Sequence, residues 1–237
     1  MQEARRFLRY IIPGILFGVL TFFQLWIATP DLANEMLKTC LFTENSSVAL
    51  AIGSLLASGA LGYLFATLHH CCHWYLPIDQ NVINHKDQIK NLRKRGLIPS
   101  PSQEPDNPRL EALTIVSILW FERLQKGGPI GNAEDRVAAY SDLAHSAGTA
   151  RIASASSLIV TILILLSYGT FNPTLANVIR YVGMLLIGIA VTWLFHDAYS
   201  RTGKISQQLY DNILEHALLS ESNDGKTVKN AEPTHQL

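Results

Sequence analysis

The sequence predicts an all-helical integral membrane protein with four transmembrane helices arranged as two hairpins. Four apolar runs approach or reach the roughly 20 residues that a helix needs to cross a bilayer. Charged residues make up only 16% of the 237 residues, against about 25% in a typical soluble domain. Lysine and arginine are also distributed unevenly among the segments between the runs, and no segment shows the alternation typical of a β-strand.

The predicted spans are Leu8–Ala28, Val48–Leu68, Ile152–Gly169 and Val178–Phe195. In the first span, Tyr10 and Trp26 fall near the two interfaces, where aromatic rings favour the headgroup layer. Arginines precede this run, as they do in a signal peptide. Its apolar stretch is longer than the 7–15 residues of a signal core, and no A-x-A-like site follows. We therefore expect it to be a retained helix.

The distribution of basic residues predicts the orientation of the spans, because cytoplasmic flanks carry the excess of Lys and Arg. The first loop, 29–47, has one basic residue, Lys38, and the hairpin 170–177 has none. The segment 70–151 has ten, and both termini are also basic. We expect both termini and the central segment to be cytoplasmic, in the cytoplasmic (inner) membrane of a prokaryote.

We expect the chain to be organised in four parts. They are a first transmembrane hairpin (1–69), a cytoplasmic helical segment (70–151), a second transmembrane hairpin with a cytoplasmic helical extension (152–220) and a disordered polar tail (221–237). A segment as long as 70–151 is too long for a plain connector, so it should have structure of its own.

Two helices are predicted in the cytoplasmic segment, Asp79–Arg95 and Arg109–Lys126, separated by the proline-rich stretch Gly96–Pro108. The apolar centre of the second helix is too short to span. It should pack against the bundle, or lie in the interface with Trp120 and Phe121 at headgroup depth. After a turn at Lys126–Asn132, a helix is predicted from about Ala133 through the third span. The fourth span likewise continues, with a bend expected at Gly203.

Small residues recur every four positions in the second span, notably Gly53 with Ala57 and Ser58 with Gly62. Such rows let helix backbones approach closely in lipid, where no hydrophobic drive acts between helices. They predict packing against a neighbouring span, a contact in a homo-oligomer, or the lining of a narrow pore.

The second span ends in His69, His70, Cys71, Cys72 and His73. Helical geometry places His69 and His73 on one face and His70 on another. With His196 and Asp197 at the end of the fourth span, they form a candidate site for zinc, iron or copper. Haem would need a histidine from each of two helices, such as His69 and His196. The competing interpretation is an interfacial belt of amphipathic side chains, in which either cysteine is open to acylation.

Composition and motifs limit the function. Nineteen basic and nineteen acidic residues balance, so no nucleic-acid partner is indicated. The sequence contains no P-loop, no GxGxxG and no GxSxG. No acidic residue lies deep in a span, which argues against ion-coupled transport.

The function hypothesis is a non-enzymatic, oligomeric membrane effector that forms a pore or responds to a signal. Its partners are the lipid bilayer, further copies of the chain and a soluble cytoplasmic protein sensed by the cytoplasmic helices. One alternative is a membrane metalloprotein or oxidoreductase that uses the histidine cluster. A further alternative is a membrane anchor for a soluble partner.

Overall fold

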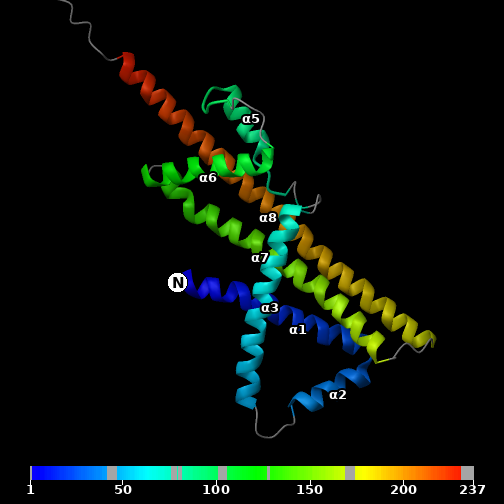
Figure 1. The fold of residues 1–237 in the computed structure, drawn as a ribbon. Helices are drawn as coiled ribbons and strands as arrows, with labels where there is room; N and C mark the ends of the chain where they lie inside the picture. Colours follow the sequence, from blue (N-terminus) through cyan, green and yellow to red (C-terminus); the bar gives the residue numbers. More distant parts are fainter. Residues whose placement is uncertain are drawn as a thin grey trace, which may run out of the picture. The chain divides into compact units, whose positions relative to one another are not determined.

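The computed structural model describes residues 2–41, 47–75, 79, 82–100, 106–126, 129–168 and 174–230. In these ranges the chain is helical, without strands. The helices are α1 (Gln2–Ala28), α2 (Pro30–Leu41), α3 (Ser47–Tyr75), α5 (Lys86–Lys94), α6 (Pro108–Lys126), α7 (Pro129–Ser167) and α8 (Leu175–Asn230) (Figure 1). The predicted all-helical class is confirmed for this part of the chain.

Four helices are long and apolar enough to cross a membrane. The candidate spans are Tyr10–Ala28, Ile52–Tyr75, Ala133–Ser167 and Leu175–Ser220. Each overlaps one of the runs predicted from the sequence, so the structure agrees with an integral membrane protein. Large apolar side chains are exposed along these helices, including Leu56, Ile179 and Leu186. Lipid rather than water would cover such surfaces.

The chain divides into two compact units. Unit 1 combines Met1–Leu76 with Leu143–Ser200, and unit 2 combines Pro77–Asp142 with Arg201–Leu237. Helices α7 and α8 therefore each contribute residues to both units. The four-part organisation predicted from the sequence stays a prediction. In the tail expected to be disordered, α8 continues to Asn230, and residues 231–237 lie outside the described residues.

In unit 1, α1 packs against α3, which crosses it in Figure 1. Two glycines make this contact close. A Cβ atom at Gly14 would overlap the backbone of Ser58, and one at Gly62 would overlap the carbonyl oxygen of Tyr10. Backbones that touch in this way maximise van der Waals contact between helices in lipid. The contact therefore depends on residues that lack a side chain.

The first loop contains a helix, α2, that the sequence analysis did not predict. Pro30 occupies the first helical position and Asp31 lies in the first turn. Proline has no N–H to leave unpaired at that position, and an acidic residue there suits the helix dipole. The helix is anchored by Ala33, which is buried in a cluster with Leu25 and Ala28 of α1. The low count of basic residues in this segment carries no information about its local structure.

Unit 2 has its own apolar core between α5, α6, the start of α7 and the end of α8. Trp120 of α6 stacks on Tyr210 of α8 with ring centroids 4.0 Å apart, and Leu92, Val116 and Leu214 are buried in the same cluster. The inner face of α6 therefore packs within unit 2, and packing of Arg109–Lys126 against the transmembrane bundle stays a prediction. Its outer face is different: Phe121, expected beside Trp120 at the interface, is 62% exposed.

Helix α5 is shorter than the predicted Asp79–Arg95. It begins at Lys86 because Asn84 uses its polar groups elsewhere: the Asn84 side chain accepts the Lys86 N–H, and its backbone pairs with the Gln207 amide of α8. Side-chain bonds of this kind compete with helix formation. The helix ends near the predicted residue, because Gly96 has a φ of 71°. The N–H groups of Gly96 and Leu97 there close the last turn on Arg93 and Leu92.

The prediction for the start of α7 was wrong by several residues. The helix begins at Pro129 and not after an N-cap at Asn132, because proline is well suited to the first helical position. From Pro129 the helix runs without interruption to Ser167. Gly203, where a bend was expected in α8, lies inside that helix and allows close packing: a Cβ there would meet Val82 Cγ1 at 2.5 Å.

We predict that Gly14→Leu destabilises the protein by at least about 1–3 kcal/mol, because a side chain there has no space against α3. The matched control is Gly18→Leu, one turn further along α1, where an added Cβ meets nothing within 4 Å. Thermal unfolding in detergent should show a clearly lower Tm for the Gly14 variant alone. Equal Tm values for the two variants would contradict the close α1–α3 contact.

Candidate functional site

A buried polar network joins α1, α7 and α8 inside unit 1. Its centre is Gln24 of α1, which is 1% exposed. The Gln24 amide donates to Ser157 Oγ at 3.3 Å, and its carbonyl oxygen accepts a hydrogen bond from Thr161 Oγ1 at 2.9 Å. Gly188 of α8 lies beside the amide, and a Cβ there would stand 3.2 Å from Gln24 Nε2. The glycine therefore leaves room for a polar side chain between three helices.

Serines of α7 extend this network. Ser157 donates to the carbonyl of Ser154 at 2.8 Å. Ser154 Oγ lies 3.0 Å from Thr192 Oγ1, whose own hydroxyl donates to the Gly188 carbonyl. The single hydroxyl hydrogen of Ser154 can be donated to Thr192 of α8 or to the Arg151 carbonyl, 3.1 Å away in its own helix. The serines that begin the third span are therefore mostly buried and bonded within the protein.

A second cluster, of aromatic and basic side chains, lies at the end of α3. Tyr199 of α8 is fully buried at its centre. His73 Nδ1 lies 2.7 Å from the Tyr199 hydroxyl, and the His69 ring meets the Tyr199 ring edge-on with centroids 5.0 Å apart. The Arg151 guanidinium lies over the same ring, 5.1 Å from its centroid, in a cation–π contact. One phenol therefore connects α3, α7 and α8.

His69 is the most enclosed histidine of this cluster. It is 1% exposed, and its ring lies directly against Gly148 of α7, where a Cβ would overlap it. His69 Nε2 is 3.4 Å from His145 Nδ1, whereas His69 Nδ1 is buried without a hydrogen-bond partner. A buried polar atom without a partner is uncommon in proteins.

The structure separates the four predicted metal ligands into different contacts. His73 pairs with Tyr199, and Arg151 donates to His196 Nδ1 at 3.0 Å. A guanidinium has only donors, so that nitrogen of His196 is already used as an acceptor. Within the described ranges, no three His, Cys, Asp or Glu side chains converge on a common point for a metal. The set of His69, His73, His196 and Asp197 stays a prediction.

The small residues of α3 are divided between two environments. Ser58 and Gly62 lie in the contact with α1. Ala57 is exposed, and nothing lies within 4 Å of a Cβ built at Gly53. One part of the predicted packing surface is thus used inside the chain, and the other part is uncovered.

Sequence reasoning missed Gln24, Tyr199 and the part played by His145. A signal for Gln24 was present, because an amide within an apolar span needs a partner. Tyr199 and His145 carried no such signal. They lie beyond the predicted spans in a polar stretch, and only the packing of three helices brings them to His69.

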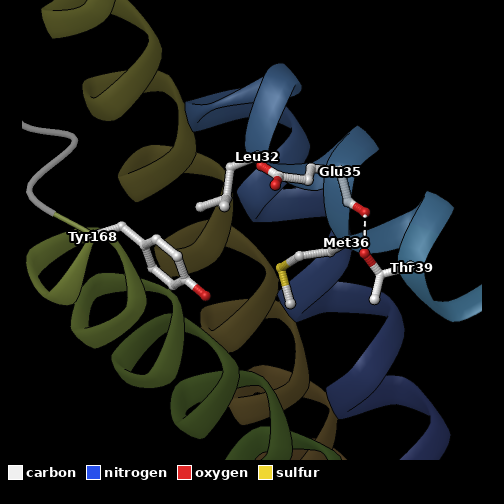
Figure 2. A pocket seen from close by; sticks show the side chains of 5 residues that line it. All are labelled: Leu32, Glu35, Met36, Thr39 and Tyr168. Carbon is white, nitrogen blue, oxygen red and sulfur yellow. Dashed lines mark hydrogen bonds between the residues drawn. The ribbon is translucent and has the colours of Figure 1, made fainter.

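A shallow pocket of about 260 Å³ lies at the other end of unit 1. It is lined by Leu32, Glu35, Met36 and Thr39 of α2 and by Tyr168, the residue after α7. Figure 2 shows the Tyr168 ring pointing from the end of α7 toward the side chains of α2. The Thr39 hydroxyl is bonded to its own helix, at the carbonyl of Glu35. A single carboxylate and a phenol define no reaction, so the histidine cluster is the stronger candidate site.

No family model, no curated protein and no solved structure matches this chain. The site is therefore interpreted from its own geometry. The Gln24 network joins helices through hydrogen bonds, and the cluster at the end of α3 offers imidazole nitrogens close to one another.

We predict that Gln24→Leu destabilises the protein by about 1–2 kcal/mol, because it removes two interhelical hydrogen bonds that average about 0.6 kcal/mol each in membranes. The matched control is Thr21→Val, since the Thr21 hydroxyl bonds only within α1, to the Phe17 carbonyl. Reversible unfolding in mixed detergents would measure the free energy of unfolding of both variants. If both variants lose the same small amount of this free energy, the Gln24 network does not stabilise the protein.

Proposed function

We propose that this chain is a non-enzymatic membrane effector that oligomerises in the cytoplasmic membrane of a prokaryote. Its spans form or gate a pore in the oligomer, and its cytoplasmic helices respond to a soluble partner. The proposal combines the four candidate spans with an uncovered small-residue surface on α3 and with a separate helical unit that carries much of the basic charge.

The observation that carries the proposal is the surface of α3 formed by Gly53 and Ala57. In lipid, an exposed large apolar side chain needs no explanation, but exposed small residues leave a groove that a second helix can enter closely. Ser58 and Gly62 in the same helix already serve this purpose toward α1. Gly53 and Ala57 are suited to the same kind of contact with another copy of α3.

The cytoplasmic assignment of unit 2 rests on the distribution of basic residues. The segment 70–151 has ten, against one in 29–47 and none in 170–177. Because α7 and α8 continue unbroken into unit 2, they offer a route by which a partner bound there influences the spans. Such a response requires an element with two conformations, and the bound partner must shift the equilibrium between them.

A second candidate, an anchor for a soluble protein, is favoured by one observation in unit 2. Leu110, Ile118 and Phe121 on the outer face of α6 are 50%, 61% and 62% exposed. An apolar row at helical spacing on a surface outside the spans is typical of a docking site for a partner helix. The same row serves the effector as its partner-binding surface.

We predict that Gly53→Leu shifts the detergent-solubilised protein from oligomer toward monomer, weakening association about ten-fold, equivalent to about 1.4 kcal/mol. Gly18→Leu adds the same side chain at another open glycine, on α1, and should leave the mass unchanged. Light scattering coupled to size-exclusion chromatography measures both. An oligomer of unchanged mass in the Gly53 variant would remove the main support for the proposal.

We predict that Asn45→Cys is labelled by a membrane-impermeant maleimide in intact cells and that Ser102→Cys is labelled only after lysis. Both changes are made in a chain with Cys40, Cys71 and Cys72 replaced by serine, so that only the new thiol reacts. The reverse labelling pattern would place both termini outside and invalidate the cytoplasmic assignment.

A further inference from the structure

Three lysines form a row along the outer face of α5 in unit 2. Lys86, Lys90 and Lys94 are exposed and follow one another at intervals of four residues, which places them on one side of the helix. Another side of the helix is buried in the apolar core of unit 2 through Ile89 and Leu92. The lysine row, Lys86, Lys90 and Lys94, therefore faces away from that core.

The lysine row differs from the arginines beside it. Arg93 forms a salt bridge with Glu111 of α6 at 2.7 Å, and Arg95, directly after α5, forms one with Glu215 of α8. In the part of the chain that the structure describes, no salt bridge joins the lysine row to an acidic side chain. Asp87 is the only carboxylate on α5 itself. The arginines thus hold α5 in unit 2, whereas the lysines remain available to an anion from outside.

The spacing of the lysine row is unfavourable for the helix alone. Like charges four residues apart on a helix repel each other and destabilise it. The row contains two such pairs, Lys86 with Lys90 and Lys90 with Lys94, in a helix of only 9 residues. A helix of this length has little stability of its own in water. An anionic surface that faces the row would neutralise the repulsion and stabilise α5.

The position of α5 in the chain indicates which anionic surface this is. The candidate span Ile52–Tyr75 ends with α3, and only residues 76–85 separate it from α5. The stretch KDQIKNLRKR (86–95) carries five basic residues against one acidic residue. A basic cluster of this size directly after a transmembrane helix is typical of a segment that binds anionic lipid headgroups. Basic and acidic residues balance over the whole chain, so a nucleic acid is not the indicated anion.

We propose that the lysine row binds the anionic phospholipid headgroups of the membrane that the chain spans, so that α5 lies against the membrane surface. Each lysine ammonium group has three N–H donors for the phosphate oxygens. This surface is distinct from the apolar row on α6, which the proposed function assigns to a soluble partner. The proposal rests on the four candidate spans, and it does not depend on the effector function.

The test places a fluorescent reporter beside the lysine row in the full-length chain. Asn91 is exposed on α5, and Asn91→Cys carries the fluorophore in a chain whose native cysteines are replaced by serine. The protein is reconstituted into bilayers of phosphatidylcholine alone or with about one third phosphatidylglycerol, each containing a lipid with a nitroxide quencher on its headgroup. Quenching should be stronger with phosphatidylglycerol. The increase should disappear at about 1 M salt, where the Debye length is about 3 Å.

Two double variants lose the same amount of charge. Lys90→Gln with Lys94→Gln should lose most of the increase in quenching, because two lysines shift the equilibrium at an anionic surface by about thirty-fold. Arg136→Gln with Lys204→Gln removes two exposed charges elsewhere in unit 2 and should keep the increase. All four side chains are exposed, so both variants should fold, and equal Tm values in detergent check this.

Three results would overturn the proposal. Equal quenching in the two bilayers would show that α5 does not respond to anionic lipid, as expected if the row binds a soluble acidic partner instead. An unchanged increase in the Lys90 and Lys94 variant would show that the lysine row is not the binding surface. An equal loss in the Arg136 and Lys204 variant would assign the effect to net charge and not to the row.

Discussion

Unit 1 depends on one constraint: a polar side chain within an apolar helix must find its partners on other helices. Gln24 meets this constraint by bonding to Ser157 and Thr161 of α7, beside the space that Gly188 leaves in α8. Lipid supplies no hydrophobic drive between helices, so directional bonds and close backbone contacts must select the arrangement. The α1–α3 contact at Gly14 and Gly62 supplies the close backbone contact. Together they determine where the end of α3 meets α7 and α8.

The fold class followed from the sequence because it depends on length and composition alone. A run such as Val48–Leu68 needs no tertiary information to be recognised, and the absence of proline between Pro129 and Pro173 made a long α7 predictable. Helix α2 was not predicted, although Pro30 followed by Asp31 is a pattern typical of a helix start. The start of α5 was not predictable either. It depends on Gln207 of α8, more than a hundred residues away, which pairs with the Asn84 backbone.

The spacing of residues along the sequence predicts only part of the candidate site. An interval of four residues placed His69 and His73 on one face, and their ring centroids are 6.4 Å apart. Spacing cannot say which neighbour each ring meets. His73 meets Tyr199, whereas His69 also contacts Gly148 and lies near His145, because α7 approaches closely where it has no side chain. His70 was expected to point elsewhere, yet its ring lies 5.2 Å from that of His145. Periodicity predicts which residues share a face of one helix, whereas the site is formed by residues of three helices.

Two contacts on the unit 2 part of α8 fix the spacing between them along the helix. Gly203 lies against Val82, and Leu214 is buried in the apolar core of unit 2. Removing one residue between Gly203 and Leu214 would rotate Leu214 by about 100° about the helix axis and draw it in by about 1.5 Å. Gly203 and Leu214 could not then both keep their contacts. Evolution can therefore lengthen or shorten this part of the helix only in steps close to whole turns.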